Sequence, residues 1–192
     1  MERMKLLFLL EVAIFSGIGL ILDRFSFSIW PQGGSISFAM VPIILMAFRW
    51  GLKGGLLTGF LVGILQIILG GAYILTPVQG ALDYPIAFTV VGMAGLFAGP
   101  IQRALGDGLM KKAVTWITVG TFIGVLLRFI CHYLAGVIFF GSGDPSVPAW
   151  LFSLTYNGSY LGPAFILTAI VLGTLLTTVP RVATQQRTRR AS

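Results

Sequence analysis

The sequence predicts an all-α integral membrane protein, folded as a bundle of six transmembrane helices. Of its 192 residues, 56% are hydrophobic and only 10% are charged, against about 25% charged in soluble domains. The mean hydropathy is +0.93. So few charges could not cover the surface of a soluble protein of this size. These values exclude a soluble globular enzyme and a disordered chain, and the length allows roughly five to seven spans of about 20 residues.

The net charge of +7 does not indicate a nucleic-acid partner, because the basic residues lie in small groups between apolar stretches. One cysteine, Cys131, and one histidine, His132, leave no Cys-rich or His-rich metal site. The sequence contains neither a phosphate-binding loop nor a recognisable catalytic pattern. We therefore expect no enzyme, no cofactor and no metal, and a partner or an ion gradient would have to supply any energy.

We expect the six helices at about 5–22, 36–48, 55–69, 84–98, 114–140 and 149–178. The first is an apolar run that Asp23 and Arg24 follow, not the small residues of a cleavage site, so it is a span and not a signal peptide. The second is too short to cross a hydrocarbon core of about 30 Å. It must therefore be partly buried among the other helices.

The remaining four helices each carry a local signal. The third has Gly55, Gly59 and Gly63 at every fourth position, a spacing that lets helix backbones approach closely, and we expect it to pack inside the bundle. The fourth opens at Tyr84, and the fifth is one long apolar run. The sixth begins just after Pro148, a residue that is tolerated at helix starts.

The distribution of basic residues predicts the orientation. With both termini cytoplasmic, eleven of the thirteen Lys and Arg residues lie inside, Arg24 lies in an outer loop and Arg128 lies within the fifth helix. The outer segments are then 23–35, 70–83 and 141–148. We expect residues 1–180 to form a single six-helix domain and residues 181–192 to form a basic cytoplasmic tail.

Polar side chains at membrane depth are candidates for function. At about 1.5 Å per residue, His132 and Asn157 lie roughly 12–13 Å below the outer ends of their helices. Tyr73, Asp83 and Tyr84 lie at the outer end of the fourth helix, so we expect the five to meet in the outer third of the membrane. One carboxylate among aromatic rings suits a cationic planar ligand, and His and Asn can hydrogen-bond a heteroaromatic edge.

Each of these residues also has a simpler interpretation. Asp83 could only cap the fourth helix, and His132 could hydrogen-bond a backbone carbonyl. The tyrosines could belong to the aromatic belt at the membrane interface. Arg128 would not help to bind a cation, so we expect it to pair with a carboxylate such as Glu11 or to bind an anionic tail of the ligand.

Five short stretches together resemble the thiamine-specific S component (ThiT family) of energy-coupling-factor (ECF) vitamin transporters. They are FRWGLKGG at 48–55, GAYIL at 71–75, LDYP at 82–85, HYLAG at 132–136 and NG at 157–158. The likeness covers roughly residues 6–176, in order and with the same helix count. The resemblance implies an S component in the bacterial cell membrane that captures thiamine from outside. It also implies docking on a transmembrane coupling subunit that carries two ATPase subunits.

The family's substrate-binding positions match Tyr73, Asp83, Tyr84, His132, Phe140, Phe152 and Asn157. Asp83 stands where the family often has the longer Glu, Phe140 where a Trp can stack on the ligand, and Phe152 where a Tyr can occur. Ala13 and Gly17 fall on the family's docking motif in the first helix, and residues 30–35 form a candidate lid.

Thiamine fits the predicted pocket, because it combines a permanently cationic thiazolium with a flat aminopyrimidine. The nearest alternative is an S component for another vitamin, such as riboflavin, or for a pyrimidine precursor. A stand-alone membrane enzyme or channel is a different class. The sequence offers it neither a catalytic pattern nor a polar cluster on the inner side.

Overall fold

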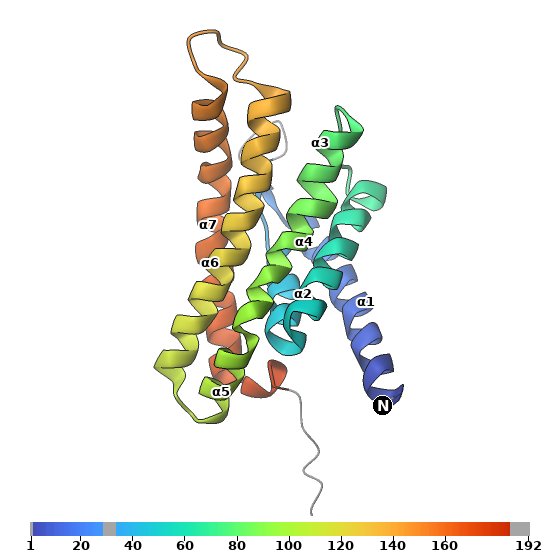
Figure 1. Cartoon of the computed structure of the whole chain (residues 1–192), viewed down its shortest axis with the longest axis vertical. Helices are drawn as coiled ribbons and strands as arrows, with labels where there is room; N and C mark the ends of the chain where they lie inside the picture. Colours follow the sequence, from blue (N-terminus) through green and yellow to red (C-terminus); the bar gives the residue numbers. More distant parts are fainter. Residues whose placement is uncertain (1, 29–33, 185–192) are drawn as a thin grey trace, which may run out of the picture.

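The computed structural model describes residues 2–28 and 34–184, which form an elongated helical bundle (Figure 1). The long helices are α1 (Glu2–Arg24), α2 (Met40–Leu69), α6 (Met110–Ala135) and α7 (Ala149–Thr178). The run between α2 and α6 comprises α3 (Pro77–Ala81), η1 (Leu82–Ile86), α4 (Ala87–Val91), η2 (Gly92–Phe97) and α5 (Ala98–Gly106). The short elements are β1 (Phe27–Ser28), β2 (Ser35–Ile36), η3 (Gly136–Phe140) and η4 (Pro180–Val182). Residues 30–33 of the candidate lid and 185–192 of the tail lie outside the described residues.

The described part of the chain confirms the all-α membrane class but not the count of six helices. Five helical runs are long and apolar enough to cross a membrane: Glu2–Arg24, Met40–Leu69, Pro77–Gly106, Met110–Phe140 and Ala149–Thr178. The count differs because α2 contains both the second and the third predicted helix. The second was also placed too early, since Ile36 belongs to β2.

The two predicted helices within α2 are arms joined at Gly51. This residue has φ 72° and ψ −160°, a left-handed conformation that glycine adopts at little cost. Ala47 lies against Gly55, although eight residues of straight helix would separate them by about 12 Å. The chain therefore turns back at Gly51. The first arm is buried from Met40 to Phe48, as the short length of the second helix predicted.

The fourth helical run begins earlier than the sequence predicted. The Thr76 side chain accepts a hydrogen bond from the backbone N–H of Gln79 at 3.1 Å, so Thr76 caps α3 and Pro77 takes the first helical position. The predicted start at Tyr84 was wrong by seven residues. Asp83 therefore lies inside a helical run, in the π-turn η1, and the interpretation of Asp83 as only a cap is also wrong.

The glycine stripe packs inside the bundle, as predicted. A Cβ at Gly59 would collide with the carbonyl of Phe88, and one at Gly55 would come within 2.6 Å of the carbonyl of Gly92. At these positions the second arm of α2 lies backbone to backbone against α4 and η2. Figure 1 shows the two runs side by side.

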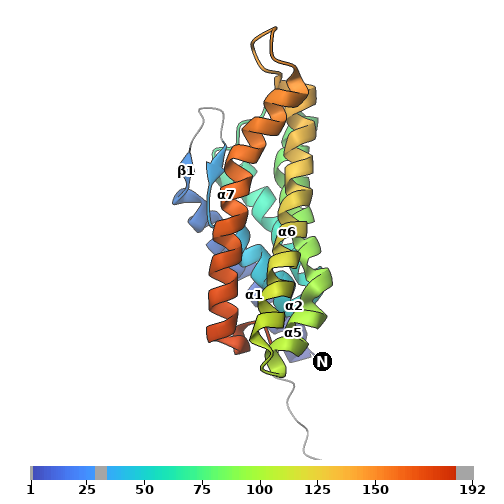
Figure 2. The same cartoon turned by 90° about the vertical axis from the view of Figure 1, so that its left-hand side faces the viewer.

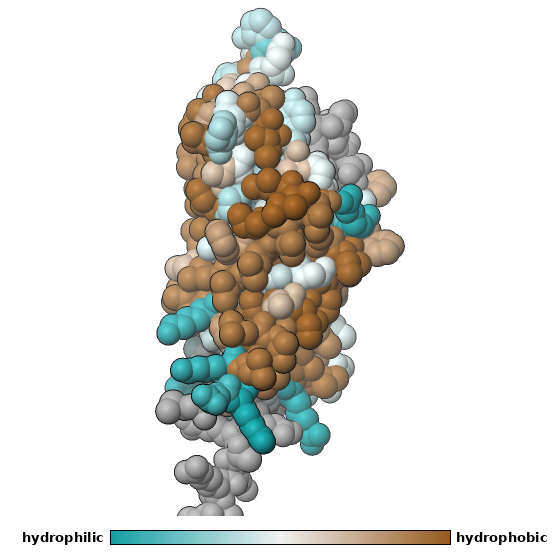
Figure 3. Space-filling model, turned by 90° about the vertical axis from the view of Figure 1, so that its right-hand side faces the viewer, coloured by the Kyte–Doolittle hydropathy of each residue, from teal (hydrophilic) through white to brown (hydrophobic). Residues whose placement is uncertain are grey.

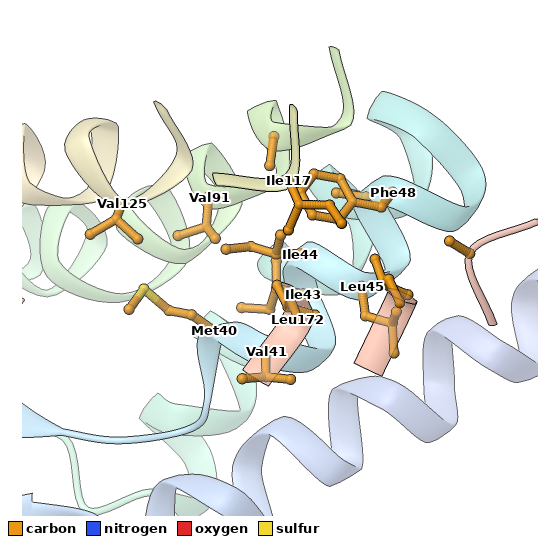
Figure 4. Packing of buried hydrophobic residues seen from close by; sticks show 14 of the residues in the cluster. Met40, Val41, Ile43, Ile44, Leu45, Phe48, Val91, Ile117, Val125 and Leu172 are labelled. Carbon is orange, nitrogen blue, oxygen red and sulfur yellow. The ribbon is translucent and has the colours of Figure 1, made fainter. Parts of the chain in front are cut away.

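The hydrophobic core lies between the two ends of the bundle. The first arm of α2 sits at its centre, where Ile44 and Phe48 meet Val91, Ile117 and other buried side chains (Figure 4). Helices α6 and α7 run side by side along the bundle (Figure 2). One outer face carries a broad apolar surface, and most of its hydrophilic groups lie towards the two ends of the molecule (Figure 3), as expected for a protein in a bilayer.

We call the end at which α1 begins and α7 ends the terminal end, and the opposite end, with segments 70–76 and 141–148, the cavity end (Figure 1). At the terminal end Glu11 accepts hydrogen bonds from Arg49 at 2.6 and 2.8 Å and from the Trp50 indole at 2.6 Å. Arg49 also donates to the backbone carbonyl of Val182 at 3.0 Å. The predicted pairing of Glu11 with Arg128 is therefore wrong.

Candidate functional site

The cavity end contains a cavity of about 430 Å³ between α1, α2, the α3–α4 run, α6 and α7. All seven residues that the sequence singled out for substrate binding line it: Tyr73, Asp83, Tyr84, His132, Phe140, Phe152 and Asn157. They come from four separate stretches of the chain, so the fold brings together residues up to 84 positions apart. This size is typical of a site for one small molecule.

A chain of polar contacts crosses the cavity wall from α3 to α6. One oxygen of Asp83, Oδ1, lies 2.7 Å from Nδ1 of His132. The other, Oδ2, accepts a hydrogen bond from the Gln79 amide at 2.5 Å. On the far side of the imidazole, Arg128 Nε lies 3.1 Å from His132 Nε2.

These contacts determine the protonation pattern of the imidazole. Because a guanidinium can only donate, His132 Nε2 must accept, and the proton must be on Nδ1, which donates to Asp83. His132 is thus a neutral tautomer between a carboxylate and a guanidinium. The Arg128 guanidinium also lies over the Phe88 ring, with its carbon 4.1 Å from the ring centroid.

The charge around the cavity favours a cation. Among the described residues that line it, the charged side chains are Asp23, Asp83 and Arg128. Two carboxylates against one guanidinium, with His132 neutral, leave an excess of negative charge. Asp83 is 8% exposed, so its carboxylate is poorly shielded by water and interacts strongly with a bound positive charge.

Aromatic rings form the other walls. Tyr73 and Phe140 lie next to each other with ring centroids 6.2 Å apart, and Phe152 stacks on Tyr156 at 5.5 Å. The Tyr84 hydroxyl accepts a hydrogen bond from the backbone N–H of Tyr73 at 2.8 Å, which ties the 70–76 segment to η1. A planar ligand would find aromatic faces from both sides of the bundle.

The side-chain amide of Asn157 is hydrogen-bonded within the protein on both its nitrogen and its oxygen. Its Nδ2 donates to the Ser153 carbonyl at 2.9 Å, and its Oδ1 accepts from the Tyr160 hydroxyl at 2.7 Å. A weaker bond at 3.3 Å reaches the backbone carbonyl of His132. Asn157 therefore joins α7 to α6 through the backbone of His132.

Sequence reasoning missed several lining residues: Asp23, Gln66, Gln79, Ser153, Tyr156 and Tyr160. Gln79 stands four residues before Asp83 and Tyr160 three after Asn157, spacings that put each pair on one helix face. For Gln79 and Asp83 this signal depends on a helical run that starts at Pro77 rather than at Tyr84. Gly34, beyond the undescribed part of the candidate lid, donates its N–H to the Tyr156 hydroxyl at 3.0 Å.

The two predicted docking residues lie away from the cavity on α1. Helix α1 buries Val12, Ser16 and Gly19 against the bundle. Ala13 is exposed, and a Cβ at Gly17 would meet no atom within 4 Å. The pair therefore occupies a face of α1 that the described part of the chain leaves uncovered.

The fold and the site together define a multi-pass helical membrane protein with an internal cavity for a small solute. The chain belongs to the family described as thiamine transporter protein (Thia_YuaJ), whose model matches residues 9–184. The members of this family are transporters rather than enzymes.

Named relatives agree over nearly the whole chain. The chain is 44% identical over 184 residues to the thiamine transporter ThiT of Bacillus subtilis, covering 94% of this chain and 96% of the relative. It is 34% identical to the ThiT of Lacticaseibacillus paracasei, covering 94% and 92%. A solved structure of ThiT from Listeria monocytogenes superimposes with a TM-score of 0.89 at 32% identity, covering 94% of this chain and 99% of that one.

Proposed function

We propose that this protein is the substrate-binding S component of an ECF-type vitamin importer and that its cavity binds thiamine. The observation that carries the proposal is the convergence of all seven sequence-predicted binding residues on one cavity. The names of its relatives point to the same substrate.

The cavity chemistry matches the two halves of thiamine. The thiazolium is a permanent cation, and the Asp83 carboxylate supplies the opposite charge in a poorly solvated place. The aminopyrimidine is flat, and the rings of Phe140 and Phe152 offer faces on which a flat ring can stack. His132 and Gln79 hold the Asp83 carboxylate in position, which reduces the entropy lost on binding.

The direct test is a calorimetric titration of the detergent-purified protein with thiamine. We expect saturable binding of one thiamine per chain. Riboflavin and a free aminopyrimidine, which represent the nearest alternative substrates, should bind much more weakly, because neither carries the thiazolium charge. Tight binding of riboflavin with no binding of thiamine would show that thiamine is not the substrate.

The proposed partners are a transmembrane coupling subunit and the two ATPase subunits that it carries. The uncovered face of α1 at Ala13 and Gly17 is the proposed docking site, because small side chains let a partner helix approach closely. The arrangement that fits this role is a single domain, residues 1–180, with residues 181–192 as a cytoplasmic tail. In this arrangement both termini are cytoplasmic and the two arms of α2 count separately towards six helices. The cavity end then faces outwards.

A bulky residue at the docking face separates binding from transport. Gly17→Trp should leave thiamine binding by the isolated protein within about twofold of the parent and should abolish thiamine uptake in cells that contain the coupling module. Gly158→Trp is the matched control, since a Cβ at Gly158, as at Gly17, would meet no atom within 4 Å. Loss of uptake in both variants, or loss of binding in Gly17→Trp, would contradict a docking role.

A further inference from the structure

The last turn of α2 carries a residue of the cavity wall, Gln66, whose amide nitrogen is unpaired within the described part of the chain. Gln66 lines the cavity and is only 3% exposed. Its Nε2 is enclosed and has no hydrogen-bond partner among the residues that the structure describes. The oxygen of the same amide lies over Gly70, at a place that a Cβ would fill. The amide nitrogen thus lies in a residue of the cavity wall, and no group in the described part of the chain accepts its N–H.

Buried polar groups in folded proteins are nearly always hydrogen-bonded, so an exception needs a reason. Three other buried side-chain atoms in the described part of the chain are also unpaired, the hydroxyls of Thr58, Thr121 and Thr168. None of these three threonines lines the cavity. Gln66 differs because its unpaired donor belongs to a residue of the binding cavity.

We propose that Gln66 is a further substrate-binding residue. Because its Nε2 is enclosed in the ligand-free structure, the amide turns into the cavity when the ligand binds, and its N–H donates a hydrogen bond to an acceptor atom of the ligand. The inference rests on the proposed function, under which the ligand is thiamine. Thiamine offers two kinds of uncharged acceptor, the ring nitrogens of the aminopyrimidine and the oxygen of the hydroxyethyl arm. Gln66 comes from α2, whereas Asp83, His132 and Asn157 come from the other walls, so it contacts the ligand from a separate side.

The test compares Gln66→Met with the parent protein. Methionine has nearly the same length and volume but no hydrogen-bonding amide. Thiamine affinity, measured by calorimetry, should fall about 3-fold to 10-fold, the usual effect of one neutral hydrogen bond. The ligand-free protein should unfold at a temperature a few degrees higher, because the substitution removes a buried donor that has no partner in that state.

Thr58→Val is the matched control on the same helix. It removes a buried unpaired hydroxyl that is remote from the cavity lining. It should raise the unfolding temperature of the ligand-free protein and leave thiamine affinity unchanged. A loss of affinity in both variants would show that changes in α2 packing, not a ligand contact, cause the effect, and it would overturn the proposal.

Two outcomes for Gln66→Met also overturn it. One is unchanged thiamine affinity. The other is a lower unfolding temperature together with the lost affinity, which would make Gln66 a structural residue. Failure of the proposed function is distinguishable, because the parent protein itself would then bind no thiamine.

An analogue with an ethyl group in place of the hydroxyethyl arm identifies the acceptor. If the variant loses affinity for thiamine and for the analogue alike, Gln66 contacts the aminopyrimidine. If only thiamine binding weakens, the acceptor is the hydroxyl oxygen. Either pattern supports a direct contact.

Discussion

The cavity end and the terminal end of the bundle are built from similar helices but differ in what lies between them. At the cavity end, Asp83, His132 and Arg128 form a polar chain beside open space, and two π-turns, η1 and η3, interrupt the regular helices. Towards the terminal end, the first arm of α2 is buried on all sides from Met40 to Phe48. Figure 4 shows this arm surrounded by apolar side chains.

The difference teaches that the molecule is built to hold a solute and not to conduct it. The polar wall stops at the cavity, and the next layer is packed hydrocarbon with Ile44 and Phe48 fully buried. A cationic solute could not cross this layer without a large cost in solvation. Transport therefore requires movement of the protein, which agrees with the proposed dependence on a coupling module.

Disruption of the packed region should have the largest effect. In Gly59→Leu the new side chain would collide with the Phe88 backbone, where α2 and α4 touch. We expect little or no folded protein, measured as the monodisperse fraction in size-exclusion chromatography. Gly162→Leu on the open face of α7 should fold normally, since nothing lies within 4 Å of a Cβ there. Folded Gly59→Leu protein with parental stability would contradict the backbone contact.

Changing the cavity wall should alter binding and leave the fold largely intact. Asp83→Asn should weaken thiamine binding by about 1.5–3 kcal/mol, the range for a charge-assisted hydrogen bond. Asn still fits the space and can accept from His132. Asp144→Asn, at an exposed carboxylate in the 141–148 segment, should bind like the parent. The measurement is calorimetry on both variants, and equal affinities in the two would remove Asp83 from the site.

Breaking the ion pair at the terminal end should have a smaller effect, on the stability of the protein and not on thiamine binding. Arg49→Gln removes the cation that pairs with the Glu11 carboxylate. Both side chains of this pair are below 20% exposed. Because some water still reaches the pair, we expect a loss of about 1–2 kcal/mol in stability. The thermal unfolding midpoint should fall while thiamine affinity stays constant, and exposed Lys53→Gln should change neither. An affinity that fell with the midpoint would show that the two ends are coupled.

The sequence predicted the cavity better than the helix ends. Depth counting along rigid helices placed His132 and Asn157 at the same level, because the rise per residue is constant. It failed where the backbone departs from a plain helix. The sequence predicts a loop between two helices where α2 turns at Gly51, and it predicts a helix start at Tyr84 although the helical run starts at Thr76–Pro77.

Side-chain pairing was beyond the reach of the sequence. Glu11 and Arg128 are both charged residues within apolar runs, and this shared setting is the signal that pairs them in the sequence. The actual partner, Arg49, depends on the turn at Gly51, which brings the end of the first α2 arm to the middle of α1. Gln66 was missed for a similar reason, since a lone glutamine in an apolar helix carries no signal until the cavity beside it is known.

A vesicle experiment tests most directly whether the molecule binds without conducting. The purified protein alone, in liposomes, would be exposed to labelled thiamine from outside, and the retained label would be followed over time. We predict that the label reaches a plateau of at most one thiamine per protein molecule and does not rise further with a thiamine gradient. Asp83→Asn liposomes, which should retain much less, give the background. Continued accumulation beyond one thiamine per protein would contradict the closed hydrocarbon layer.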